Sequence, residues 1–179
     1  MDRASQACRD AVAQLTRARI APEALAEYVP AGRRFVLFPR AATMRPLGEV
    51  WRLGRLLLST EAALYATGRA TRAQERGRVG YQSLSREERK DIAAAALHGG
   101  YPVGTPVNFD ALPLLLAELA AEHKLSPTSV PEAEVPIGLN DGAFRVRWRA
   151  GAPLAGGQTL ESYLAERVEL LIHPPFAAD

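Results

Sequence analysis

The sequence predicts an α+β fold in which amphipathic helices pack on one face of an antiparallel sheet. Three observations indicate this class: an Asp-Gly turn between alternating apolar runs, a second pair of alternating runs within residues 46–73, and segments with a helical apolar stripe. The 179 residues are 47% hydrophobic and 23% charged, as is typical of a soluble globular protein. We therefore expect a single domain over residues 1–179. A small closed β-barrel with helices is the alternative, suggested by Gly54 and Gly68.

The clearest signal is a β-hairpin within residues 134–150, closed by Asp141 and Gly142. A type I′ turn needs positive φ at both central residues, which Asp-Gly supplies. The turn sets a register with large apolar residues on one face. The predicted pairs on that face are Leu139 with Phe144, Ile137 with Val146 and Val135 with Trp148, and Asn140 faces Ala143 beside the turn. The opposite face would carry Arg145, Arg147 and Arg149, with Glu134 opposite Arg149. Because Pro136 cannot donate to a ladder, we expect the first strand at a sheet edge.

Periodicity and turn residues predict the remaining elements. Helices are expected over residues 2–19, from Pro22 to before Pro30, from Ser85 to His98, over 110–123 and after Thr159; Gly99 would supply the left-handed cap after His98. Residues 34–38 read as a strand, and residues 46–73 as a second hairpin with a bulge at Gly54 and a loop from Ser59 to Ala63. A flexible basic linker is expected at 72–84 and a connector at 125–133. Residues 165–173 fit either helix or strand.

The distribution of charge is uneven along the chain. Residues 1–90 hold 17 basic and 9 acidic side chains, whereas residues 91–179 hold 5 and 11. Such a split is compatible with an anionic partner for the first half. The other interpretation, which we favour, is that the two halves lie side by side and neutralise each other.

Cysteine, histidine and apolar runs exclude several classes of protein. Cys8 is the only cysteine, so no internal disulfide can form, and a reducing, cytoplasmic compartment is expected. Its place on an apolar stripe predicts a small buried hydrophobe. No run approaches the roughly 20 apolar residues of a membrane helix. The three histidines are far apart without metal-ligand spacing, so we expect no metal and no cofactor.

The strongest candidate site is the row Arg145, Arg147 and Arg149. Side chains two apart on a strand lie roughly 6.5–7 Å apart, so three guanidinium groups would stand in line on one face, where they could bind phosphates or carboxylates. The ordinary alternative is a solvated sheet face. Gly151 and Gly156 have the glycine spacing of a phosphate loop, but the Lys and Ser or Thr that should follow are absent, so a nucleotide triphosphatase is excluded.

Two further candidates come from other segments. His98 and Tyr101 belong to a Gly- and Pro-rich segment, residues 98–106, that could line the active site of a small enzyme. Residues 72–90 carry six basic residues and could contact nucleic acid.

The sequence does not decide the function. Our leading hypothesis is a non-enzymatic binding or regulatory module that recognises a small anionic ligand or an acidic protein surface. An enzyme acting near His98 and Tyr101 comes second, and nucleic-acid binding through the basic first half is third. The ligand, any reaction and the oligomeric state stay open.

Overall fold

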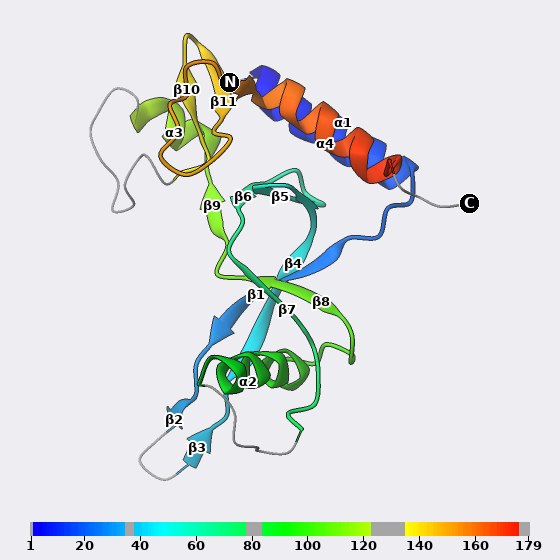
Figure 1. The fold of residues 1–179 in the computed structure, drawn as a ribbon, viewed down its shortest axis with the longest axis vertical. Coiled ribbons are helices and arrows are strands. Elements are labelled where there is room, and N and C mark those ends of the chain that lie inside the picture. The colour runs from blue at the N-terminus through cyan, green and yellow to red at the C-terminus, as the bar shows by residue number, and fades with distance from the viewer. Residues whose placement is uncertain (1, 35–37, 78–83, 123–134, 176–179) are drawn as a thin grey trace. The chain divides into compact units, whose positions relative to one another are not determined.

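A computed structural model describes residues 2–34, 38–77, 84–122 and 135–175 (Figure 1). The chain forms two compact units. Unit 1 comprises residues 1–21, 51–66 and 112–179, and unit 2 comprises residues 22–50 and 67–111. Helices, a mixed sheet and a small antiparallel sheet confirm the α+β class. Each unit has more contacts within itself than with the other, but this does not show whether the units fold separately. The single domain therefore stays a prediction.

Seven strands are hydrogen-bonded in the order β7-β8-β1-β4-β5-β6-β9. Their bounds are β1 Glu23–Val29, β4 Thr43–Leu53, β5 Leu56–Ser59, β6 Leu64–Ala66, β7 Arg69–Arg72, β8 Pro106–Phe109 and β9 Leu112–Leu114. The sheet is mixed because β1 pairs in parallel with β8 and antiparallel with β4. The end strands β7 and β9 are not neighbours, so the described strands do not close into the alternative barrel.

Two smaller sheets and four helices complete the described structure. The three-stranded sheet has the order β10-β11-β12, and β2 pairs with β3. The bounds are β2 Gly32–Arg34, β3 Phe38–Arg40, β10 Ile137–Asn140, β11 Ala143–Val146, β12 Gln158–Thr159, α1 Asp2–Arg17, α2 Leu84–His98, α3 Leu116–Glu122 and α4 Leu160–Ile172. The two hairpins and the strand near Arg34 therefore belong to three sheets and not to the one sheet predicted.

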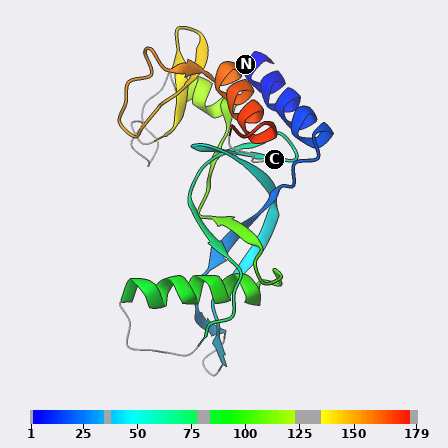
Figure 2. The ribbon, with the colours of Figure 1, turned by 45° about the vertical axis from the view of Figure 1, so that its right-hand side comes forward.

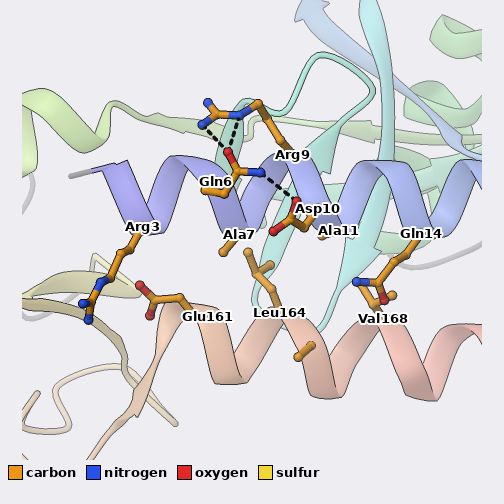
Figure 3. A pocket seen from close by; sticks show the side chains of 11 residues that line it. Arg3, Gln6, Ala7, Arg9, Asp10, Ala11, Gln14, Glu161, Leu164 and Val168 are labelled. Atoms are coloured by element: carbon orange, nitrogen blue, oxygen red, sulfur yellow. Dashed lines mark hydrogen bonds between the residues drawn. The ribbon is translucent and has the colours of Figure 1, made fainter.

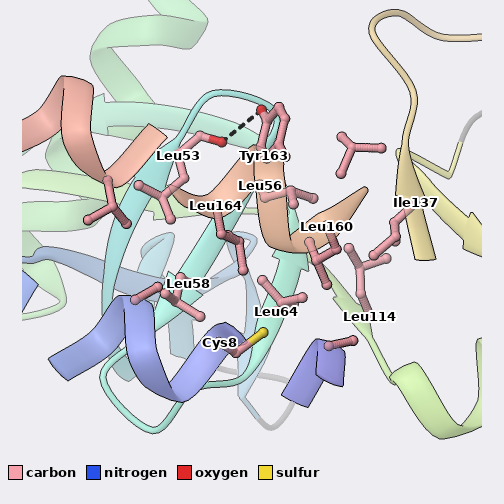
Figure 4. Close-up of a cluster of buried hydrophobic side chains, with 14 of the residues drawn as sticks. Cys8, Leu53, Leu56, Leu58, Leu64, Leu114, Ile137, Leu160, Tyr163 and Leu164 are labelled. Carbon is pink, nitrogen blue, oxygen red and sulfur yellow. Dashed lines mark hydrogen bonds between the residues drawn. The ribbon is translucent and has the colours of Figure 1, made fainter. Parts of the chain in front are cut away.

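Unit 1 is built around the helix pair α1 and α4, which lie side by side (Figure 2). Their apolar stripes meet β5 and β6 in one buried cluster (Figure 4). Cys8 lies in this cluster at 1% exposure, which confirms it as a small buried hydrophobe. The pKa of its thiol is raised to about 11. Burial is the main cause; the charge of Glu161 adds to the rise and the charge of Arg9 opposes it. A thiol that stays protonated at neutral pH is a poor nucleophile.

Unit 2 buries the alanine-rich face of α2 against its strands. The second buried cluster joins Ala95 and Ala96 of α2 with Met44, Val107 and Phe109. Small alanine side chains let the helix backbone approach the strands closely, because there is little side-chain volume between them. Helix α2 ends at His98, as predicted, but the positive φ of 91° belongs to Gly100 and not to Gly99. Gly99 serves a different need, since a Cβ there would lie 2.2 Å from the Met44 carbonyl oxygen.

The Asp141-Gly142 hairpin has the predicted register over its four central pairs. Strands β10 and β11 pair Ile137 with Val146, Gly138 with Arg145, Leu139 with Phe144 and Asn140 with Ala143. Asp141 and Gly142 have φ values of 50° and 74°, as the turn requires. Strand β10 is an edge strand of the three-stranded sheet and β11 is its central strand, as expected from Pro136.

The predicted helix from Pro22 is wrong, because these residues form β1. Alanine and glutamate favour a helix in isolation, but β1 lies between β4 and β8 and pairs with both. Asn108 Nδ2 donates to Glu23 Oε2 at 2.8 Å and so supports this pairing through a side chain. Hydrogen bonding to the two neighbouring strands outweighs the helix propensity of these residues, which is only a few tenths of a kcal/mol per residue.

The predicted second hairpin is only partly right. The Ser59–Ala63 turn is present, since the Ser59 amide donates to the Ala63 carbonyl and β5 pairs with β6. Gly54 is wrong as a bulge: it has a φ of 63° in the turn between β4 and β5. The return strand breaks at Gly68, after which β7 pairs with β8 instead.

The segments around β9, α4 and the β2–β3 hairpin agree with their predictions to different degrees. The predicted helix 110–123 is replaced by edge strand β9, where Pro113 is tolerated, followed by the short helix α3. The final segment is helix α4, with Thr159 as its N-cap accepting from the Ser162 amide. The predicted strand 34–38 is wrong where it is described, because Arg34 and Phe38 pair across the β2–β3 hairpin. The connector 125–133 and part of the linker 72–84 lie outside the described residues.

Candidate functional site

The predicted arginine row is not a row on one solvated face. Arg147 is buried, with 7% of its surface exposed. Its Nε donates to the Val135 carbonyl at 3.1 Å, and its Nη1 donates to the Ala152 carbonyl. Both partners are backbone oxygens, so this guanidinium is occupied by the protein itself.

The reason is the segment after β11, residues 147–157, which we call the arginine loop. It folds back over the face of the hairpin that was predicted to meet water. Gly138 makes room for it, since a Cβ there would lie 2.6 Å from Leu154 Cδ1. Arg145 is half-buried beneath the same loop and donates from Nη1 to the Gly157 carbonyl at 2.7 Å. Arg145 and Arg147 therefore hold the loop in place.

Trp148 also differs from its prediction. It was expected on the apolar face opposite Val135, but it lies beyond the last ladder pair and is 69% exposed. The guanidinium carbon of the exposed Arg149 lies 4.6 Å from the centroid of its ring. This cation–π pair therefore faces solvent. Glu134, the predicted partner of Arg149, lies outside the described residues.

A further arginine reaches the base of this loop from the turn between β4 and β5. Arg55 Nη1 donates to the Arg147 carbonyl at 3.1 Å, and the Arg55 amide donates to the Tyr163 hydroxyl at 3.0 Å. We call Arg55, Trp148 and Arg149 the Trp148 surface. Sequence reasoning missed Arg55, because it is far from the hairpin along the chain and no local pattern marks it.

The two tryptophans provide a direct test of this arrangement. Trp51 is 4% exposed and its Nε1 donates to the Ile20 carbonyl at 2.9 Å. We expect acrylamide to quench the fluorescence of Trp148 strongly and that of Trp51 weakly, so Trp148→Phe should remove most of the quenchable emission. Stern–Volmer plots of the two proteins measure this. Equal quenching of the wild type and the Trp148→Phe variant would contradict the exposed position.

The enzyme candidate lies in unit 2. His98 is exposed at the end of α2, and its Nδ1 lies 3.2 Å from the Ala42 carbonyl oxygen. The Tyr101 hydroxyl is buried and has no hydrogen-bond partner among the described residues, so no hydrogen bond couples it to His98. Burial raises the pKa of this phenol. An enzyme at this place stays a prediction.

The basic strip around residues 72–90 is partly neutralised by local ion pairs. Arg76 Nε lies 2.5 Å from Asp91 Oδ1, and Lys90 Nζ lies 3.1 Å from Glu87 Oε1. The charge split between the sequence halves also largely disappears in the structure. Unit 1 holds 11 basic and 12 acidic residues, and unit 2 holds 11 and 8. The asymmetry arises because the chain passes between the units, and it gives little support to a basic nucleic-acid strip.

A groove of about 570 Å³ lies along α1 and α4 (Figure 3). Its floor includes Ala7, Leu164 and Val168. On the rim, Gln6 accepts from Arg9 at 2.7 Å and donates to Asp10 at 2.8 Å, so the two opposite charges are bridged by one amide. The mixed rim favours neither an anionic nor a cationic ligand.

Searches for metal ligands and membrane-spanning helices among the described residues, and comparisons with known proteins, indicate no further site. Among the described residues, no group of three or more His, Cys, Asp or Glu side chains could hold a metal ion. None of the described helices is both long and apolar enough to cross a membrane. Comparisons with protein families, with curated proteins and with solved structures found no match to this chain.

Proposed function

We propose that this protein is a non-enzymatic binding module that recognises an anionic ligand or an acidic partner at the Trp148 surface. The observation that carries the proposal is the exposed Trp148 with the Arg149 guanidinium over its ring. Burying a large aromatic side chain is favourable by roughly 2 kcal/mol or more, so leaving one in water at a fixed place is typical of recognition surfaces.

The three predicted arginines have different roles in this proposal. Arg145 and Arg147 position the arginine loop, because their guanidinium groups donate to its own carbonyls. Arg149 is exposed and supplies the positive charge that meets the ligand. A rigid loop lowers the entropic cost of binding, since the contact residues are already ordered.

The test replaces Arg149 by glutamine and follows Trp148 fluorescence during titration with inorganic pyrophosphate and, separately, poly-L-glutamate at low ionic strength. We expect one of these probes to shift the emission of the wild type, and Arg149→Gln to weaken that binding about tenfold, as for a charge-assisted hydrogen bond. Arg17→Gln, which removes the same charge from exposed Arg17 on α1, is the matched control and should bind as the wild type does. Neither probe binding, or an equal loss in the control, would refute the proposal.

A further inference from the structure

We propose that the anion bound at the Trp148 surface is a nucleotide, a phosphate joined to a planar aromatic base. This inference rests on the proposed function and names the ligand class for the same surface. The base would stack on the indole of Trp148, and the phosphate would meet Arg55 and Arg149.

The geometry of the indole ring supports the stacking part. Arg149 covers one face at 4.6 Å from the centroid, yet the residue keeps 69% of its surface exposed. The opposite face is therefore open. A flat open indole face attracts another flat π system, and every base has one. A carboxylate or a bare phosphate gains nothing from such a face.

The charges beside the ring support the phosphate part. Among the described residues, neither Arg55 nor Arg149 lies within ion-pair distance of a carboxylate, whereas Arg69 pairs with Glu88 at 2.9 Å. Arg55 uses Nη1 for the Arg147 carbonyl, which places its guanidinium beside the residue that precedes Trp148. A guanidinium has five N–H donors, so capacity for phosphate oxygens remains. Within the described part of the chain, two cations without a carboxylate partner therefore contact this loop, Arg149 over the indole ring and Arg55 at the Arg147 carbonyl.

The experiment compares ligands that differ only in the base. Isothermal titration calorimetry with AMP, UMP and ribose 5-phosphate measures the contribution of stacking. We expect at least one nucleotide to bind about fivefold or more tightly than ribose 5-phosphate. Trp148→Leu should abolish that difference, so that the nucleotides and ribose 5-phosphate bind this variant equally, and Trp148→Phe should keep part of it. Thermal unfolding of each variant checks that it is folded.

The outcomes separate this inference from the proposed function. If ribose 5-phosphate binds as tightly as both nucleotides, or if only poly-L-glutamate binds, anion recognition survives and the nucleotide is overturned. If no phosphate compound and no polyanion binds, both fail. An oligothymidylate arm identifies the source of the nucleotide: tighter binding than that of a mononucleotide indicates single-stranded nucleic acid, and equal or weaker binding indicates a free nucleotide.

Discussion

Replacing Arg147 by methionine is expected to lower the free energy of unfolding by about 3 kcal/mol. The methionine side chain can occupy much of the same buried space, so the main loss is the hydrogen bonds to the Val135 and Ala152 carbonyls. A hydrogen bond to a charged group is worth roughly 1.5–3 kcal/mol, and a buried carbonyl left without a donor costs about 1–3 kcal/mol. Urea denaturation of the wild type and the variant measures the difference.

The control for this change is Arg149→Met in the same loop. Arg149 is exposed, so its replacement should change the stability by no more than about 0.5 kcal/mol. A second consequence separates positioning from contact. Arg147→Met should weaken ligand binding even where the protein is folded, because the loop that carries Trp148 loses its anchor at Ala152. Equal stability losses in the two variants would show that Arg147 is not a buried anchor.

Replacing Gly68 by alanine is expected to cost about 2–3 kcal/mol of stability. A Cβ at this position would lie 2.2 Å from the Asp110 carbonyl oxygen and 2.4 Å from that of Phe109, so the backbone between β6 and β7 must move. Overpacking of this kind typically costs about 1–3 kcal/mol, and backbone atoms cannot move aside as cheaply as a flexible side chain.

Gly32→Ala is the matched control for Gly68→Ala. Gly32 also belongs to a strand region, but a Cβ there would meet nothing within 4 Å. Its replacement should leave the unfolding midpoint nearly unchanged. Thermal or urea unfolding of both variants measures the contrast. Two variants as stable as the wild type would show that no close backbone approach occurs at Gly68.

Local signals predicted the elements whose partners are near in sequence. The Asp141-Gly142 turn and alternating apolar residues predicted the β10–β11 register, since both strands and the turn lie within ten residues. Helix α1 and the start of α4 followed from their apolar stripes, whereas residues 165–173 also fitted a strand. These features depend on backbone preferences and on side chains one or two turns apart.

Distant partners decided the elements that the sequence mispredicted. The Ala- and Glu-rich residues of β1 became a strand because β4 and β8 offered hydrogen bonds on both sides. The candidate site changed for a related reason. The alternation of side chains along the second hairpin strand predicted that Arg147 meets water and Trp148 lies in the core. It does not show that a later segment of the chain covers the face of the hairpin that carries Arg147. Once the loop lies there, the arginine can donate to its carbonyls while the tryptophan lies beyond the ladder.

The sequence by itself determined the α+β class, the pairing of one hairpin from Ile137–Val146 to the turn, and the buried character of Cys8. Only the tertiary structure decided which arginines are structural and which reach solvent, and it brought Arg55 to Arg147 across 92 positions of the chain. The physical reason is that the periodicity of a strand fixes the face on which a side chain lies. What covers that face depends on segments far away, and burial with hydrogen-bond partners then decides whether a charge is held or free to bind.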